Sequence, residues 1–161
     1  MIKKILVGVD GSENSEQALD YALEIADKFS ASIHVLNVFQ PPLEFEDRLN
    51  MLNMPPASSN PEEPAVYPSN MAAITRDLRK LHEAVLSRAA KRATKLKPAL
   101  EITAELKEGD PSSQIVETAT NGQFDLIVIG HRGNSKIKEL FLGSTSERVA
   151  HQAKCAVLII K

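Results

Sequence analysis

Residues 126–153 read LIVIGHRGNSKIKELFLGSTSERVAHQA, and this stretch decides the fold. It begins with four residues typical of a buried strand and ends with a helical pattern. Its glycines stand between these two patterns: Gly130 and Gly133 are separated by two residues, and Gly143–Ser144 follows after nine more. A glycine at the end of a strand lets the main chain approach a ligand closely or adopt a positive φ, because it has no Cβ. The stretch therefore predicts a strand, a glycine loop and a helix in succession.

Similar apolar runs recur along the chain and alternate with helical patterns. The predicted strands are Ile2–Val9, Ala31–Phe39, Ala99–Lys107, Asp125–Gly130 and Cys155–Ile160. The predicted helices are Glu13–Phe29, Met71–Lys97, one that Asp110 and Pro111 open, and one that Gly143 and Ser144 open. Strands that alternate with helices form right-handed βαβ units around a parallel sheet. We therefore predict an α/β fold, a three-layer doubly wound sandwich with five parallel strands in the order 3-2-1-4-5, which binds ligands where the strand order reverses.

The composition indicates one globular domain over residues 1–161. Hydrophobic residues make up 43% of the chain, charged residues make up 25%, and the net charge of -2 argues against a dedicated nucleic-acid surface. The single cysteine, Cys155, cannot form an internal disulfide, so we interpret it as a small buried residue in a reducing compartment. No apolar run is long enough to span a membrane, and the apolar start is too short for a signal peptide. We expect a cytoplasmic protein without a membrane partner.

Two segments carry further predictions. Residues 40–69 hold seven of the nine prolines, so we expect a Pro-rich flexible insertion within the domain. Whether this insertion is inert, or serves as a flap or a partner surface, stays open. Apolar residues in the long helix are spaced by threes and fours apart from one step of seven, and we predict that they form a core-facing stripe: Met71, Ile74, Leu78, Leu81, Val85, Ala89 and Leu96.

The glycine loop combines features that are typical of an anion-binding site. Ser144 and Glu147 form the S-x-x-E pattern of a capping box, and the N–H groups at a helix start favour an anion. The loop itself is basic, with His131, Arg132, Lys136 and Lys138 against the single acidic Glu139. Main-chain donors together with cationic side chains suit a polyphosphate. The alternative is that these glycines only form ordinary turns.

The first strand contributes a carboxylate to the same edge of the predicted sheet. Asp10 follows that strand directly, in the sequence VGVDGS, and the predicted order makes the first and fourth strands neighbours. We therefore expect Asp10 and the loop after Gly130 to face one crevice. Asp10 could accept a hydrogen bond from an adenine amino group or a ribose hydroxyl, or help to hold a metal. The alternative is that Asp10 or Ser12 only caps the following helix.

These residues resemble the universal stress protein family. The family's nucleotide signature, G-x2-G-x9-G-[S/T], is matched by Gly130, Gly133, Gly143 and Ser144, and the likeness extends over essentially the whole chain. The resemblance implies an adenine nucleotide alpha hydrolase-like fold that binds ATP, with Mg²⁺ bridging the phosphates. One departure is the Pro-rich stretch, which is longer than in compact members and leaves closure of the site open.

The resemblance also implies a role for individual residues. Gly8, Val9 and Asp10 would lie at the adenine or ribose end, Val38 would flank the adenine through its main chain, and Ile129 and Gly130 would line the ribose. Further along the chain, the resemblance implies that the phosphates are held by Gly133, Gly143, Ser144, Thr145 and Ser146, with Arg132 as a cationic neighbour and His131 as a weaker candidate.

Motifs of other nucleotide enzymes are absent from the sequence. There is no G-x-x-x-x-G-K-[S/T], no G-x-G-x-x-G after the first strand, and neither HRD nor DFG. Hydrolysis of ATP would also need a base within reach of the γ-phosphate; we expect Asp10 at the wrong end of the nucleotide, and His131 is only a candidate. We therefore expect an ATP-binding regulatory protein that acts as a nucleotide-dependent switch and is at most a weak ATPase. A slow ATP hydrolase and an interaction protein that binds no nucleotide remain as alternatives.

The last predicted strand suggests a partner. Residues 155–160 form the outer strand of the predicted sheet, and the apolar run Ala156–Ile160 has no charge or proline to block pairing at its edge. The simplest closed arrangement is a homodimer in which this strand lies antiparallel to its copy. The resemblance points the same way, and a helix or the Pro-rich segment covering the edge is the alternative.

Overall fold

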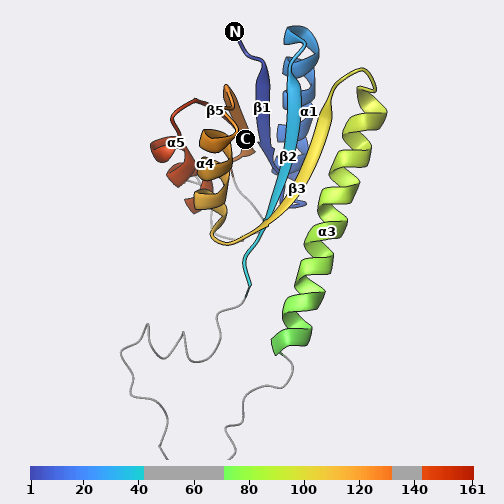
Figure 1. Cartoon of the computed structure of the whole chain (residues 1–161), viewed down its shortest axis with the longest axis vertical. Helices are drawn as coiled ribbons and strands as arrows, with labels where there is room; N and C mark the ends of the chain where they lie inside the picture. The colour runs from blue at the N-terminus through green and yellow to red at the C-terminus, as the bar shows by residue number, and fades with distance from the viewer. Residues whose placement is uncertain (42–70, 132–142) are drawn as a thin grey trace, which may run out of the picture.

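The computed structural model describes residues 1–41, 71–131 and 143–161, and these form a sandwich around one parallel sheet (Figure 1). The strand order is β3-β2-β1-β4-β5, with all neighbouring pairs parallel. The strands are β1 (Lys4–Gly8), β2 (Ser32–Phe39), β3 (Ile102–Glu108), β4 (Leu126–Gly130) and β5 (Ala156–Ile160). The predicted fold class and strand order are confirmed. The predicted strand ends differ from the observed ones by at most three residues, at the start of β3.

Helices cover both faces of the sheet. One face carries α1 (Glu13–Phe29) and α3 (Met71–Leu96), and the other carries α4 (Pro111–Asn121) and α5 (Ser144–Gln152). The predicted start of α4 is confirmed, because Asp110 is its N-cap and accepts a hydrogen bond from Ser113 N at 2.9 Å, while Pro111 is the first helical residue. None of the helices in the described residues is long and apolar enough to cross a membrane.

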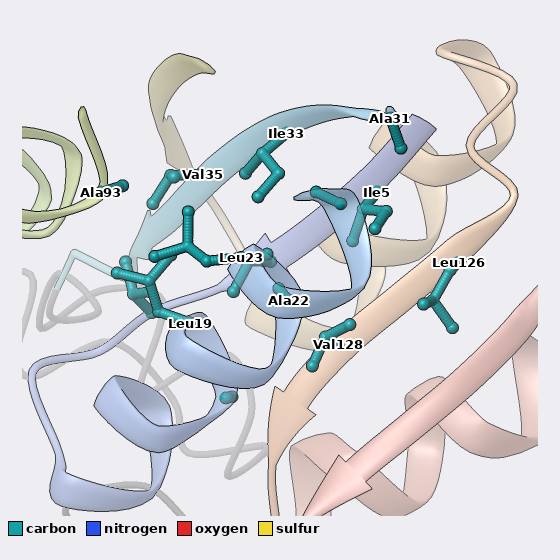
Figure 2. Packing of buried hydrophobic residues seen from close by; sticks show 14 of the residues in the cluster. Ile5, Leu19, Ala22, Leu23, Ala31, Ile33, Val35, Ala93, Leu126 and Val128 are labelled. Atoms are coloured by element: carbon teal, nitrogen blue, oxygen red, sulfur yellow. The ribbon is translucent and has the colours of Figure 1, made fainter. Parts of the chain in front are cut away.

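The core consists of two hydrophobic clusters, one on each face of the sheet. Side chains of successive residues in a strand point to opposite faces, so Val128 lies in the cluster under α1 while Ile127 and Ile129 lie in the cluster under α4 and α5. Figure 2 shows the first cluster, where Leu19 and Leu23 of α1 pack onto the sheet. The central strands β1 and β4 are buried on both faces, which explains their continuous apolar sequences.

The predicted core stripe of α3 is wrong in part. Ile74, Leu81 and Leu96 are 45%, 63% and 52% exposed, whereas Ala93, outside the predicted stripe, is fully buried. The first turns of α3 extend past the carboxyl edge of the sheet, so no strand lies beneath them (Figure 1). The step of seven residues from Ala89 to Leu96 passes over Ala93, which makes the core contact there. Ala89 does pack against the core, as predicted, and the side chain of Met71 lies outside the described residues.

Ion pairs join α1 and α3 along their length. From the carboxyl edge of the sheet to the amino edge, the pairs are Arg88–Glu16 at 3.8 Å, Arg92–Asp20 at 2.8 Å, and Lys97 with Glu24 at 3.0 Å and Asp27 at 2.7 Å. Because most of these side chains are well exposed, each pair contributes little to stability.

The Pro-rich segment falls almost entirely outside the described residues, which resume at residue 71. Its assignment as an insertion within the single domain, and the choice between an inert segment, a flap and a partner surface, therefore remain predictions.

Candidate functional site

The candidate site lies at the carboxyl ends of β1 and β4, where the strand order reverses. These strands pair directly, with Ile5 opposite Leu126 and Val7 opposite Val128. Continuing this register places Val9 opposite Gly130, so Asp10 and the glycine loop leave the sheet side by side. The sequence predicted this meeting from the strand order alone, and ligands bind at such reversal points in doubly wound sheets.

The two ends of the glycine loop are tied together. Gly143 N donates to His131 O at 2.8 Å. The Ser146 hydroxyl lies 2.9 Å from His131 O and 2.8 Å from Gly143 O, so its single proton is shared between these two carbonyls. The loop therefore starts and ends at one point, at the mouth of α5. Residues 132–142 between these ends, including Arg132 and Gly133, lie outside the described residues.

His131 is held against β5. Its main-chain N donates to Ile160 O at 2.6 Å, and its ring Nδ1 lies 3.2 Å from the same oxygen. The ring thus has a structural partner on the outer strand. Ser146 is likewise occupied, because it is 3% exposed and its hydroxyl serves the loop ends. Any contact of Ser146 with a ligand falls to its main-chain N–H.

The predicted capping box at α5 is wrong. Gly143 is the N-cap, with φ −61° and ψ 147°, and Ser144 is already the first helical residue. The S-x-x-E pattern is therefore one residue out of register with the helix start. Because the N-cap is a glycine, no cap side chain bonds the first turn of α5. A helix start of this kind leaves its N–H groups to other acceptors, such as water or an anion.

The turn from β1 into α1 is built around Asp10 and Ser12. Asp10 Oδ1 accepts hydrogen bonds from Ser12 N at 3.0 Å and from the Ser12 hydroxyl at 2.5 Å. Ser12 is the N-cap of α1 and accepts from Ser15 N at 3.3 Å. The alternative prediction, that Ser12 caps the following helix, is thus confirmed, and Asp10 holds the Ser12 side chain in place. These bonds leave a ligand contact of Asp10 untested.

Gly130 is explained by packing. It does not adopt a left-handed φ. A Cβ at this position would lie 2.8 Å from Asn14 Cβ and 2.9 Å from Asn14 C, in the first turn of α1. Close approach of a helix, which sequence analysis did not consider, therefore requires this glycine. By contrast Gly11, in the turn beside Asp10, does have a positive φ of 81°, a conformation that favours glycine.

A buried polar network at the same edge escaped sequence analysis. Asn37 in β2 is 1% exposed; its Nδ2 donates to Val9 O at 2.7 Å, and its Oδ1 lies 2.6 Å from Nδ1 of His82 in α3. The His82 ring also packs against Phe39, with centroids 5.5 Å apart. The one signal in the sequence is that Asn37 interrupts the apolar run of β2, since a buried amide needs partners.

Chemically reactive groups are few in the described residues. They contain no group of three or more His, Cys, Asp or Glu side chains that could hold a metal ion. Cys155 is half-buried and packs against the second core cluster, and this burial raises the pKa of its thiol. A thiol of raised pKa is a poor nucleophile, which agrees with the structural role predicted for it.

Comparison with known proteins gives the family. The model of the universal stress protein family matches residues 1–161. Universal stress protein MJ0531 of Methanocaldococcus jannaschii is 30% identical over 100% of this chain and 83% of its own length. A universal stress protein solved in complex with cAMP is 28% identical, with a TM-score of 0.65 over 99% of this chain and 96% of that one. The universal stress protein of Archaeoglobus fulgidus in complex with dAMP has a TM-score of 0.63 at 23% identity over 100% of both chains, and shows the fold alone. The chain belongs to the universal stress protein family.

Proposed function

We propose that this protein binds an adenine nucleotide, with ATP as the ligand, at the reversal point between β1 and β4. The observation that carries the proposal is the hydrogen bond from Gly143 N to His131 O, which closes the glycine loop beside Asp10. This bond brings the end of β4 to the start of α5, and the N–H groups of a helix start without a side-chain cap suit a phosphate. The cAMP complex of a relative supports an adenine nucleotide as the ligand class.

The adenine would lie beyond the end of β1, against Val38. Leu36 O accepts from Val9 N at 2.9 Å, so Leu36 bonds toward β1. Alternate residues of a strand in a parallel sheet bond to the same neighbour, so the N–H and C=O of Val38 are directed to this side as well. One donor and one acceptor side by side complement the ring nitrogen and amino group of adenine. Gly8, Val9 and Asp10 would then border the base and ribose, with Ile129 and Gly130 opposite.

The phosphates would lie at the mouth of α5. We assign them to the main-chain N–H groups of Gly133, Ser144, Thr145 and Ser146, with Arg132 as a cationic neighbour. Gly143, whose own N–H donates to His131 O at 2.8 Å, would border the phosphates without a side chain in their way. The helix dipole adds about 0.3–1 kcal/mol of favourable interaction with an anion at this end. Mg²⁺ would be held chiefly by phosphate oxygens and water, as is usual for this ion.

Binding without efficient turnover is the activity that we propose. Hydrolysis needs a general base within reach of the attacking water. The Nδ1 of His131 lies 3.2 Å from Ile160 O on the outer strand, so His131 could serve as this base only through its Nε2. We therefore propose a cytoplasmic, nucleotide-dependent switch in the stress response, with little or no ATPase activity.

Equilibrium titration of the purified protein with ATP tests the proposal. We expect a dissociation constant well below millimolar with Mg²⁺ present. Absence of affinity at millimolar ATP, with and without Mg²⁺, would reject nucleotide binding. Phosphate released over hours in the same samples would favour the slow hydrolase over the switch.

We also propose that the protein is a homodimer through residues 155–160. β5 is an edge strand, with Val157, Leu158 and Ile159 only half-buried. An apolar strand edge readily pairs with another chain. Leu158→Lys would place a charge in such an interface, so light scattering should report a monomer. An unchanged dimer mass, or a monomeric parent protein, would refute pairing through this strand.

A further inference from the structure

The buried amide of Asn37 lies where β2 runs past the last residue of β1. Asn37 comes from β2, Val9 from the end of β1, and His82 from α3, which is 45 residues further along the chain than Asn37. The two contacts of the Asn37 side chain, at 2.7 and 2.6 Å, hold its amide between a main-chain carbonyl and an imidazole. The network thus joins α3 to the residue that directly precedes Asp10.

The chemistry of the partners fixes the orientation of each group. The Val9 carbonyl can only accept, so Nδ2 of Asn37 faces it and Oδ1 faces His82. Because Oδ1 can only accept, Nδ1 of His82 must carry a proton. The neutral Nδ1–H tautomer and the imidazolium both satisfy this requirement, so the network survives either charge state of His82.

If the ladder between β2 and β1 continued by one step, the main-chain N–H of Val38 would donate to the Val9 carbonyl. Leu36 and Val38 face β1, and Val9 N already donates to Leu36 O at 2.9 Å, so the next step of the ladder would run from Val38 N to Val9 O. In the described part of the chain, the Asn37 side chain takes this carbonyl instead. A side-chain amide therefore stands in for one main-chain bond of the sheet.

We propose that Asn37 and His82 are positioning residues that make the protein selective for adenine, an inference that rests on the proposed function. Asn37 satisfies Val9 O, which releases the Val38 N–H to donate to the base. His82 locks the Asn37 amide in the orientation that does so. Val38 then presents a donor and an acceptor that match adenine, whereas hypoxanthine, with N1–H and a 6-oxo group, presents the reverse pattern.

The position of His82 on α3 supports this role. The imidazole is braced by Phe39, whose ring centroid is 5.5 Å away. One turn further along, Val85 packs against the turn beside Asp10, where a Cβ on Gly11 would lie 3.1 Å from Val85 Cγ2. The helix therefore contacts both strand ends that border the proposed base site, and His82 is its polar contact there.

The test compares three ligands by equilibrium titration: ATP, inosine triphosphate and inorganic tripolyphosphate. The parent protein should prefer ATP over inosine triphosphate by about tenfold or more, the effect of one mismatched hydrogen-bonding edge. Asn37→Leu frees the Val9 carbonyl to recapture Val38 N–H, and should lower this preference to less than about threefold. Its affinity for tripolyphosphate should not change, because the phosphate end is untouched.

A pair of His82 variants provides the matched control. His82→Leu removes the donor and should lose the preference, whereas His82→Asn restores a donor at the same place and should keep it. This pair decides the question if Asn37→Leu does not fold. A full ATP preference in His82→Leu or in folded Asn37→Leu would overturn the inference while leaving nucleotide binding intact. A parent protein that binds no ATP would instead reject the proposed function.

Discussion

Substituting Gly130 by alanine should separate β4 from the first turn of α1. An added Cβ would lie 2.8 Å from Asn14 Cβ, 2.9 Å from Asn14 C and 3.1 Å from Asn14 O. Real Cβ atoms essentially never come within 3.0 Å of such neighbours, and two of the three contacts are main chain. Main-chain atoms in a helix cannot rotate away, so the strand end or the helix start has to move.

Two opposing terms set the size of the effect. Overpacking of this kind costs about 1–3 kcal/mol, while replacing glycine by alanine stabilises by about 0.4–1 kcal/mol through the unfolded chain. We therefore expect a net loss of roughly 1–2 kcal/mol in the free energy of unfolding. For a chain of this size that loss corresponds to a fall in melting temperature of about 2–8 °C.

Gly8→Ala is the matched control, because Gly8 ends the neighbouring strand β1. Its added Cβ would meet only side-chain atoms, Ile129 Cγ2 at 3.0 Å and Ile115 Cδ1 at 3.4 Å, and these can shift slightly. Urea unfolding of both variants, in the absence of nucleotide, measures the difference directly. If Gly130→Ala is no less stable than Gly8→Ala, the main-chain contact with α1 does not explain the glycine at the end of β4.

Three further predictions concern the helix ends and the contact between α1 and α3. The Ser112 hydroxyl and other donors hold the pKa of Asp110 below its usual value. The Asp110 cap therefore stabilises the fold at neutral pH, and this contribution is lost as the pH falls through the folded-state pKa. In urea unfolding, Asp110→Ala should cost about 1 kcal/mol at pH 7 and progressively less in acid. Ser12→Ala removes the α1 cap and should lower the free energy of unfolding by about 0.5–2 kcal/mol, and a change within error would contradict the cap. Arg92 Nη2 donates to Asp20 Oδ2 at 2.8 Å, so a double-mutant cycle of these two residues should give a coupling of about 0.2–1 kcal/mol that falls in concentrated salt; a coupling that salt leaves unchanged would contradict an ionic contact.

The fold was predictable because it depends on local patterns and general rules of topology. Continuous apolar runs such as Leu126–Ile129 identify strands that are buried on both faces, and the helices between them make the sheet parallel. Hydrophobic periodicity was a poor guide in α3, whose first turns extend beyond the sheet. Periodicity assigns Ile74 and Leu81 to a core face, but they are 45% and 63% exposed. Ile74 lies in the first turn of α3, beyond the strand ends, whereas at Leu81 the next residue, His82, is the one that contacts β2. Periodicity describes a face of the helix and cannot tell how far the neighbouring layer extends.

Some parts of the candidate site could also be predicted from the sequence, and others could not. The spacing of the glycine motif fixed which loop leaves β4 and which helix receives it, and the ends of that loop do meet at His131 and Gly143. The cap of α5 was misplaced by one residue, because S-x-x-E fits a helix that starts at either of two adjacent positions.

The contact between Asn37 and His82 could not be predicted from the sequence, for a different reason. Their contact depends on how α3 crosses the end of β2, and a polar pair 45 residues apart leaves no periodic trace. Local sequence therefore predicts the phosphate end of the proposed site, whereas the groups that we propose select the base arise only from tertiary packing. A variant in the glycine motif should thus weaken binding of every nucleotide alike, whereas a change in α3 at His82 should alter which base is preferred.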